Sequence, residues 1–199
     1  VLAAQREDTY RKRDAVLRSN PKEAMAELEV LCTEVVDDIF NANWKAEGAA
    51  ANAPPPEAAD DALATKLIGK LQTFFGAIDL SADALTGVNR AAATAAANAA
   101  VSKALDAKVA SLDGVREGLA FESMRYLRLL QADNLWKGHM KAMNFVKDFA
   151  GLKVYNQQDP LDVYREEGLG LYEKMQAGLR QNSVFSFFAY DPRAKAAAK

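Results

Sequence analysis

Apolar residues recur at alternating steps of three and four along much of this 199-residue chain. That spacing is the period of an α-helix that packs on another helix. The pattern is clearest after Asn20-Pro21, where a capping residue precedes a proline at the first helical position and Glu23 follows as the reciprocal acidic residue. We therefore expect an all-α fold, in which one face of this helix carries Met25, Leu28, Cys32, Val35 and Ile39.

Composition narrows the possible functions. The hydrophobic fraction of 50% is enough for a buried core. A net charge of -2 gives no positive field that would attract a phosphate backbone, so we expect no nucleic-acid partner. One cysteine and one histidine make neither an internal disulfide nor a set of metal ligands, so we expect no metal. Because Cys32 lies on the apolar face, a core position is a better interpretation than a nucleophile.

The amino terminus and the apolar stretches of the sequence indicate how the chain could contact a membrane. No stretch of eighteen apolar residues runs without charges, and the amino terminus lacks the pattern of a signal peptide. We therefore expect any membrane contact to be peripheral or made through a partner. The chain begins without an initiator methionine inside a predicted helix that extends to about Ser19, so we expect it to be a fragment or a processed product.

The middle of the chain predicts a small helical insert. Three consecutive prolines between Lys45 and Asp61 disfavour both helix and sheet, so this stretch is expected to be a linker or an exposed loop. A weaker helix should follow with Leu63, Leu67, Leu71 and Phe74 on one face. The alanine-rich run from Ala91 to Ala110 should also be a helix, because Val101, Leu105, Val109 and Leu112 keep helical spacing.

Two long helices are predicted for the last third. The first should run from about Val115 to Ala150, with Gly118 and Gly138 only weakening it, and should end at Gly151 as a left-handed cap. Asp159-Pro160 should start the second as cap and first residue. The short connection between them predicts an antiparallel hairpin. The segment from Ser183 to Tyr190 could extend the second helix or form a short strand.

The region from Leu135 to Gly168 carries a strong resemblance to a known family. Its residues L-W-K-G-H-M-K-A-M, V-Y-N-Q-Q-D-P and Y-R-E-E-G resemble the signature L-W-x-x-H-[LM]-x-x-M, x-Y-x-Q-x-D-P and Y-x-x-E-[GS] of the SecA preprotein translocases. The order and spacing of these segments agree with the family. The matched positions are Trp136, His139, Met143, Tyr155, Gln157, Asp159, Pro160, Tyr164 and Glu167.

Both ends of the chain add to this resemblance. Q-R-E-D-T-Y-R-K-R-D-A-V-L, from Gln5 to Leu17, is similar to Q-R-x-x-I-Y-x-x-R-x-x-[IL]-L in the long scaffold helix of the family, with Thr9 and Val16 as departures. L-R-Q-N-S-V-F-S-F-F-A-Y-D-P, from residue 179, resembles the ending of cyanobacterial and plastid members. The stretch from Leu135 to Gly168 departs from the family at Lys153-Val154, usually arginine-glycine, and at Asn144, usually aspartate.

The resemblance implies a division of the chain. Residues 1–46 would be the first part of a helical scaffold, and residues 47–114 a helical wing, assigned by position alone. Residues 115–190 would be the second part of the scaffold with a two-helix finger, and residues 191–199 a disordered tail. In the finger, Trp136, His139, Met143, Gly151, Asp159, Pro160 and Tyr164 would be structural residues.

The resemblance also implies a function. The chain would couple the ATP-driven motion of a motor to polypeptide movement, and its partners would be a SecY/SecE-type Sec channel, an unfolded preprotein, the SecA motor domains and, peripherally, a membrane surface. Its location would be the plastid stroma or the bacterial cytoplasm, at the thylakoid or inner membrane. Contact with the channel and the polypeptide would be made at the fingertip by Tyr155, helped by Lys153, Asn156 and Gln157.

Catalysis by the chain itself is not expected. No G-x-x-x-x-G-K-[ST] loop occurs, so ATP and Mg²⁺, the cofactors of the full-length family, should not bind to this chain alone. His139 has no evident nucleophile partner and is interpreted as a residue hydrogen-bonded between packed helices. Adjacent Glu166 and Glu167 should lie on a solvated face. A hypothesis of another class remains open, in which the chain is a docking subunit of a larger assembly without a motor.

Overall fold

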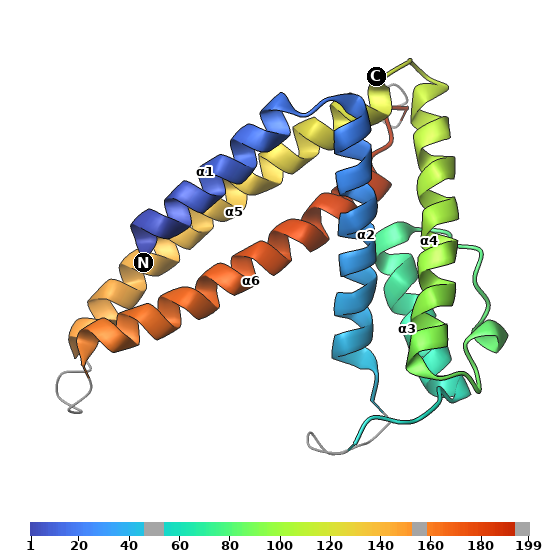
Figure 1. The fold of residues 1–199 in the computed structure, drawn as a ribbon, viewed down its shortest axis with the longest axis horizontal. Helices are drawn as coiled ribbons and strands as arrows, with labels where there is room; N and C mark the ends of the chain where they lie inside the picture. The colour runs from blue at the N-terminus through green and yellow to red at the C-terminus, as the bar shows by residue number, and fades with distance from the viewer. Residues whose placement is uncertain (46–53, 153–158, 194–199) are drawn as a thin grey trace. The chain divides into compact units, whose positions relative to one another are not determined.

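The structure, a computed structural model, describes residues 1–45, 54–152 and 159–193, with only the backbone of residues 151 and 152. Apart from one short 3-10 turn, η1 (Ala82–Ala84), every element within these ranges is an α-helix, and they contain no strand. The predicted all-α fold is confirmed (Figure 1). The helices are α1 (Leu2–Arg18), α2 (Pro21–Asn43), α3 (Asp61–Phe75), α4 (Arg90–Asp113), α5 (Leu119–Leu152) and α6 (Pro160–Ala189).

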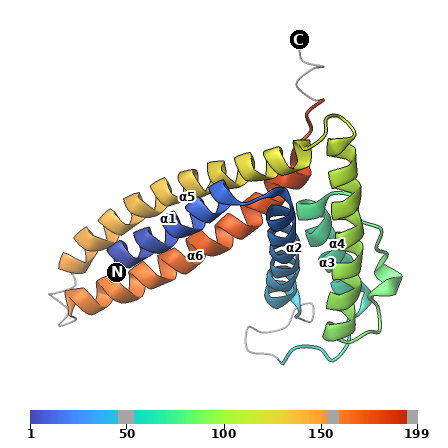
Figure 2. The same cartoon turned by 45° about the horizontal axis from the view of Figure 1, so that its top comes forward.

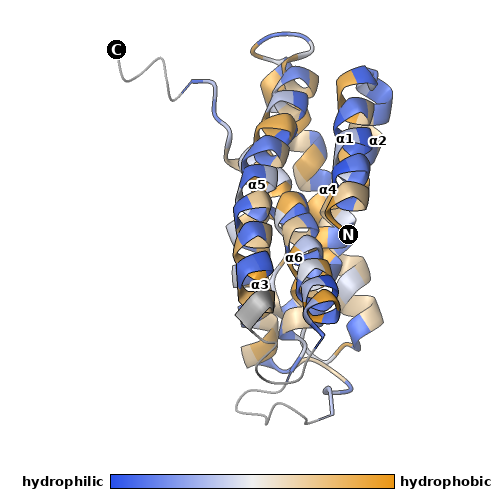
Figure 3. Cartoon of the chain, turned by 90° about the vertical axis from the view of Figure 1, so that its left-hand side faces the viewer, coloured by the Kyte–Doolittle hydropathy of each residue, from blue (hydrophilic) through white to orange (hydrophobic). Residues whose placement is uncertain are grey.

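The chain forms two compact units. Unit 1 contains residues 1–20 and 125–183, and unit 2 contains residues 21–124 and the chain from residue 184 onward. Unit 1 is therefore built from α1 and the greater parts of α5 and α6, which lie side by side in two views (Figures 1 and 2). Along its helices, polar and apolar residues interchange, as amphipathic helices require (Figure 3).

Unit 2 has a core shared by α2, α3 and α4. The predicted apolar face of α2 is buried, with Leu28, Cys32 and Val35 each at most 3% exposed. Opposite it, α4 presents Ala93, Ala97 and Val101, whose small side chains let the two helices approach closely. The alanine-rich run is thus an ordered helix, as predicted. Further members of this core are Leu63, Leu67, Leu71, Leu105, Leu112, Val184 and Phe187.

The unit boundaries differ from those that the sequence led us to expect. The expected scaffold segment covers residues 1–46, whereas the compact units are defined by packing: α2 packs with α3 and α4, so the boundary between units falls between Asn20 and Pro21. The physical reason is that the apolar face of α2 is buried against the insert. Residues 46–53 of the expected linker and residues 194–199 of the expected tail lie outside the described residues.

Two local expectations are corrected, and one open alternative is decided. The helix predicted from Val115 begins only at Leu119, because Gly118 adopts a φ of 77° and the Asp113 carboxylate accepts from the Ala120 N–H at 2.9 Å. Gly151 does not end α5, which continues to Leu152. Of the two alternatives for the segment that starts at Ser183, the helix is confirmed, because residues 183–189 extend α6.

Candidate functional site

Helices α5 and α6 pair in an antiparallel sense within unit 1. Gly178 faces Leu135, the rings of Tyr172 and His139 are 5.6 Å apart, and Gly168 faces Met143. The partner on α6 has a lower residue number as the residue on α5 has a higher one, so the two helices run in opposite directions, as in a helical hairpin. The predicted hairpin is confirmed for these described residues. Asp159 caps α6 as predicted, because its carboxylate accepts from the Leu161 N–H at 2.8 Å.

Helix α1 packs along both helices of this hairpin. It runs antiparallel to α5, since Tyr10 packs on Trp136 with ring centroids 6.3 Å apart and Arg13 pairs with Asp133 at 3.0 Å. It runs parallel to α6, because the Lys12 ammonium donates to the Gln176 side chain at 3.1 Å four residues beyond Tyr172. Unit 1 is thus a three-helix bundle in which α1 contacts both α5 and α6.

A buried hydrogen-bonded set joins the three helices. Gln5 of α1 is 7% exposed; its side-chain Nε2 donates to the Gly168 carbonyl of α6 at 2.9 Å, and its Oε1 lies 2.9 Å from His139 Nε2 of α5. His139 is 4% exposed, and its burial lowers the pKa of the imidazole. The expected position of His139, hydrogen-bonded between packed helices, is confirmed. We call Gln5, His139 and Gly168 the triple contact.

A second polar cluster lies one helical turn along α1. The Tyr172 hydroxyl donates to Asp8 Oδ2 at 2.6 Å, and the Lys12 ammonium lies 2.8 Å from the same oxygen. These two contacts, with Lys12 as the larger cause, hold the pKa of Asp8 well below its usual range. Burial, and then the bond to Asp8, raise the pKa of Tyr172. The cluster is partly exposed, so we regard it as a support of the α1–α6 packing rather than a catalytic group.

The other residues predicted for the finger occupy different environments. Met143 is buried at 1% exposure against Gly168. Trp136 and Tyr164 are only half-buried. Glu166 and Glu167 are exposed, as expected of a solvated face. The four predicted fingertip residues, Lys153, Tyr155, Asn156 and Gln157, lie outside the described residues.

Sequence reasoning missed most of the polar partners in this bundle. Gln5 and Gly168 belong to the matched segments, but nothing in their spacing indicated that they touch each other. The available signal was the residue type at each position. A buried glutamine needs partners for both ends of its amide, and a glycine inside a long helix often marks a close approach of another element.

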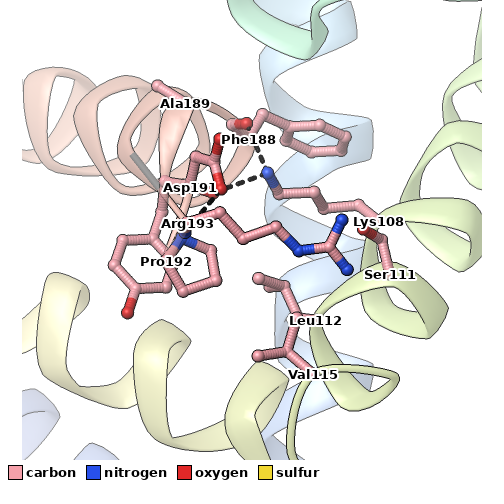
Figure 4. A pocket seen from close by; sticks show the side chains of 10 residues that line it. Lys108, Ser111, Leu112, Val115, Phe188, Ala189, Asp191, Pro192 and Arg193 are labelled. Carbon is pink, nitrogen blue, oxygen red and sulfur yellow. Dashed lines mark hydrogen bonds between the residues drawn. The ribbon is translucent and has the colours of Figure 1, made fainter. Parts of the chain in front are cut away.

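Unit 2 contains a polar hollow of about 280 Å³ at the end of α6 (Figure 4). The Lys108 ammonium of α4 donates to the carbonyls of Phe188 at 2.8 Å and Tyr190 at 2.7 Å. It thereby satisfies carbonyls that have no partner within α6. Burial lowers the pKa of Lys108, against a smaller opposite effect of Asp191. The hollow thus has a structural explanation, and we assign it no ligand.

Neither a metal centre nor a membrane span is found in the described part of the chain. Residues 1–45, 54–152 and 159–193 contain no group of three side chains of the kinds that bind metals. Among the described helices, none is both long enough and apolar enough to cross a bilayer.

Comparison with known proteins identifies the family. The family model of the SecA Wing and Scaffold domain matches residues 1–191. The chloroplastic protein translocase subunit SecA of Ostreococcus lucimarinus is 33% identical over 97% of this chain and 20% of its own length. The SecA subunit of Synechococcus sp. (strain WH7803) is 31% identical over 96% of the chain and 19% of its own length. The chain thus spans about a fifth of these relatives, and it belongs to the SecA wing and scaffold domain family.

Proposed function

We propose that this chain is the scaffold, wing and two-helix finger of a SecA-type protein translocase, and that it couples ATP-driven motion to preprotein transport. The observation that carries the proposal is the family match over residues 1–191. The antiparallel packing of α5 and α6 supports it, because two antiparallel helices are the arrangement that a two-helix finger requires. The relatives are named translocase subunits, which favours this proposal over a docking subunit.

In this proposal the residues between α5 and α6 contact the moving polypeptide and a Sec channel of the SecY/SecE type. Tyr155 supplies an aromatic face with a hydroxyl, which can stack on or hydrogen-bond many different side chains. Lys153, Asn156 and Gln157 supply a positive charge and amide groups around it. Such a set accepts many sequences, as a transport machine for unfolded chains requires.

The chain itself contributes contact and position, and no chemistry. ATP with Mg²⁺ would be bound and hydrolysed by motor domains outside these residues. The chloroplastic and cyanobacterial relatives favour the plastid stroma or the bacterial cytoplasm, with peripheral attachment at the thylakoid or inner membrane.

The first test is the parent gene. We expect sequence upstream of Val1 to encode an ATPase with a phosphate-binding loop. A complete parent gene without such a motor would contradict the proposal and would leave the docking-subunit hypothesis.

The second test is transport by the full-length parent protein into membrane vesicles. Tyr155→Ala should reduce transport of a labelled preprotein strongly while the melting temperature stays near that of the unaltered protein. The matched control is Tyr126→Ala, which removes the same side chain from a position on α5 that is 66% exposed. Normal transport by Tyr155→Ala, or an equal loss in both variants, would show that the fingertip assignment is wrong.

A further inference from the structure

The triple contact is a buried polar arrangement in unit 1, and each helix of the bundle contributes one member. Gln5 comes from α1, His139 from α5 and Gly168 from α6. By contrast, the ion pair of Arg13 on α1 with Asp133 on α5 is open to solvent, so water can take the place of either partner at little cost in free energy. A buried polar group that loses its partner has no water to replace it.

Hydrogen-bond chemistry fixes the orientation of this set. The Gly168 carbonyl can only accept, so the Gln5 atom that lies 2.9 Å from it must be the amide nitrogen. The other end of the amide is then an oxygen, which can only accept, so His139 Nε2 must carry a proton and donate to it. The pattern therefore requires one tautomer of the neutral imidazole, with the proton on Nε2.

The geometry also fixes the axial position of α1. A slide of α1 by one residue is about 1.5 Å and by one turn about 5.4 Å, and either would separate Gln5 from His139 and Gly168. Met143 fills the space over Gly168, where an added Cβ would lie 2.8 Å from its Cε, so α6 cannot turn freely against α5 at this level. The three helices are thus held in one register at one point.

We propose that Gln5 and His139 are positioning residues for the finger, whose hydrogen bonds transmit an axial displacement of α1 to α5 and α6 together. This inference rests on the proposed function, because the displacement would come from the motor and would be delivered to the fingertip. His139 lies thirteen residues before Leu152, the last residue of α5, which is about 20 Å along a helix. Without the triple contact, α1 could slip along the finger and its motion would be lost before reaching the tip.

A test on the 199-residue chain examines the contact apart from transport. Because His139 is the single histidine, its ring nitrogens give unambiguous ¹⁵N signals. We expect the Nε2–H tautomer in the unaltered chain, and a mixture of tautomers in Gln5→Leu, which removes the acceptor. The Nδ1–H tautomer in the unaltered chain, or no change in Gln5→Leu, would overturn the proposal.

The decisive variants compare two amides of different reach at position 139. His139→Gln can place an amide N–H close to the position of Nε2, whereas the shorter side chain of His139→Asn cannot. In the full-length parent, we expect His139→Asn and Gln5→Leu to lower the amount of preprotein moved per ATP hydrolysed by about fivefold or more. His139→Gln should keep this ratio close to that of the unaltered protein.

A control separates positioning from loss of stability. Met175→Ala removes a buried side chain of α6 that takes no part in the triple contact, and it should lower the melting temperature with little change in preprotein moved per ATP. If the ratio follows the melting temperature in all these variants, or if His139→Gln and His139→Asn behave alike, the positioning role is refuted.

Tyr155→Ala in the same series separates the two proposals. If Tyr155→Ala blocks transport while Gln5→Leu and His139→Asn keep the normal ratio, only the positioning proposal fails. If Tyr155→Ala transports normally, the proposed fingertip function fails as well, whatever the tautomer of His139.

Discussion

Replacing Gly168 with alanine tests the close approach of α6 to α5. An added Cβ would lie 2.8 Å from Met143 Cε, 3.3 Å from its Sδ and 3.4 Å from Val1 Cγ1. Met143 is 1% exposed, so its flexible end has little room to move away, and such overpacking costs about 1–3 kcal/mol. Alanine also favours the helix by about 1 kcal/mol over glycine. We therefore expect Gly168→Ala to lower the free energy of unfolding by about 0–2 kcal/mol.

The matched control is Gly170→Ala, two residues further along the same helix. A Cβ at Gly170 meets no atom within 4 Å, so this variant has the gain in helix propensity without the clash. Because the propensity gain is common to both variants, their difference measures the overpacking alone. Gly170→Ala should be more stable than Gly168→Ala by about 1–3 kcal/mol.

Urea unfolding followed by tryptophan fluorescence measures this difference in unit 1. The two tryptophans fall in different units, Trp136 in unit 1 and Trp44 in unit 2, so a Trp44→Phe background leaves a signal from unit 1 only. Any cost of Trp44→Phe is the same in both variants and cancels. Equal stabilisation by the two alanines would refute the close packing of Gly168 on Met143.

Three further predictions concern side chains in both units. Trp136→Ala should cost about 2 kcal/mol, less than the roughly 3–5 kcal/mol of a fully buried tryptophan, because Trp136 is half-buried; a melting curve in urea checks this. Burial raises the pKa of the Cys32 thiol to about 12, so we expect no alkylation by iodoacetamide at pH 8 until unit 2 unfolds, and rapid labelling of the native chain would contradict this. Burial lowers the pKa of His139 below its unfolded value of about 6.5, so the unfolded chain binds the proton more readily. Stability of unit 1 should thus fall as the pH decreases from about 6.5 through the lower folded pKa, and His139→Gln should remove this contribution, as urea titrations at several pH values would show.

The helices could be predicted because their signals are local. Asp159-Pro160 starts α6 through a cap and a fixed φ, which depend on neighbouring residues only. The face of α2 with Leu28 and Val35 follows from the helical period, and both residues are buried as expected. Helix ends are less certain, because single-turn extensions cost little free energy, and α5 accordingly passes Gly151 by one residue.

The division into units could not be predicted from the same signals. A stripe of apolar residues shows that a helix packs, but not which helix it packs against. The family resemblance placed α2 with the scaffold, whereas its contacts with α3 and α4 place it in unit 2. The alanines of α4 were the signal that α2 packs against α4, because a run of small side chains permits the close approach that α2 makes there.

The triple contact was harder to predict than the unit boundaries, because Gln5 is more than 130 residues from His139 and more than 160 from Gly168 in the sequence. Each has an ordinary local interpretation: Gln5 as a polar residue of a charged helix, Gly168 as a weak point in α6. Their meaning arises only from the pairing of α1 with both finger helices. A buried polar residue with its partners often contributes no more stability than an apolar residue of similar volume, so the presence of Gln5 at this position favours a role in holding register over a role in stability alone. The comparison of His139→Gln with His139→Asn tests that distinction directly, because the two variants have the same chemistry and differ in whether they can reach Gln5.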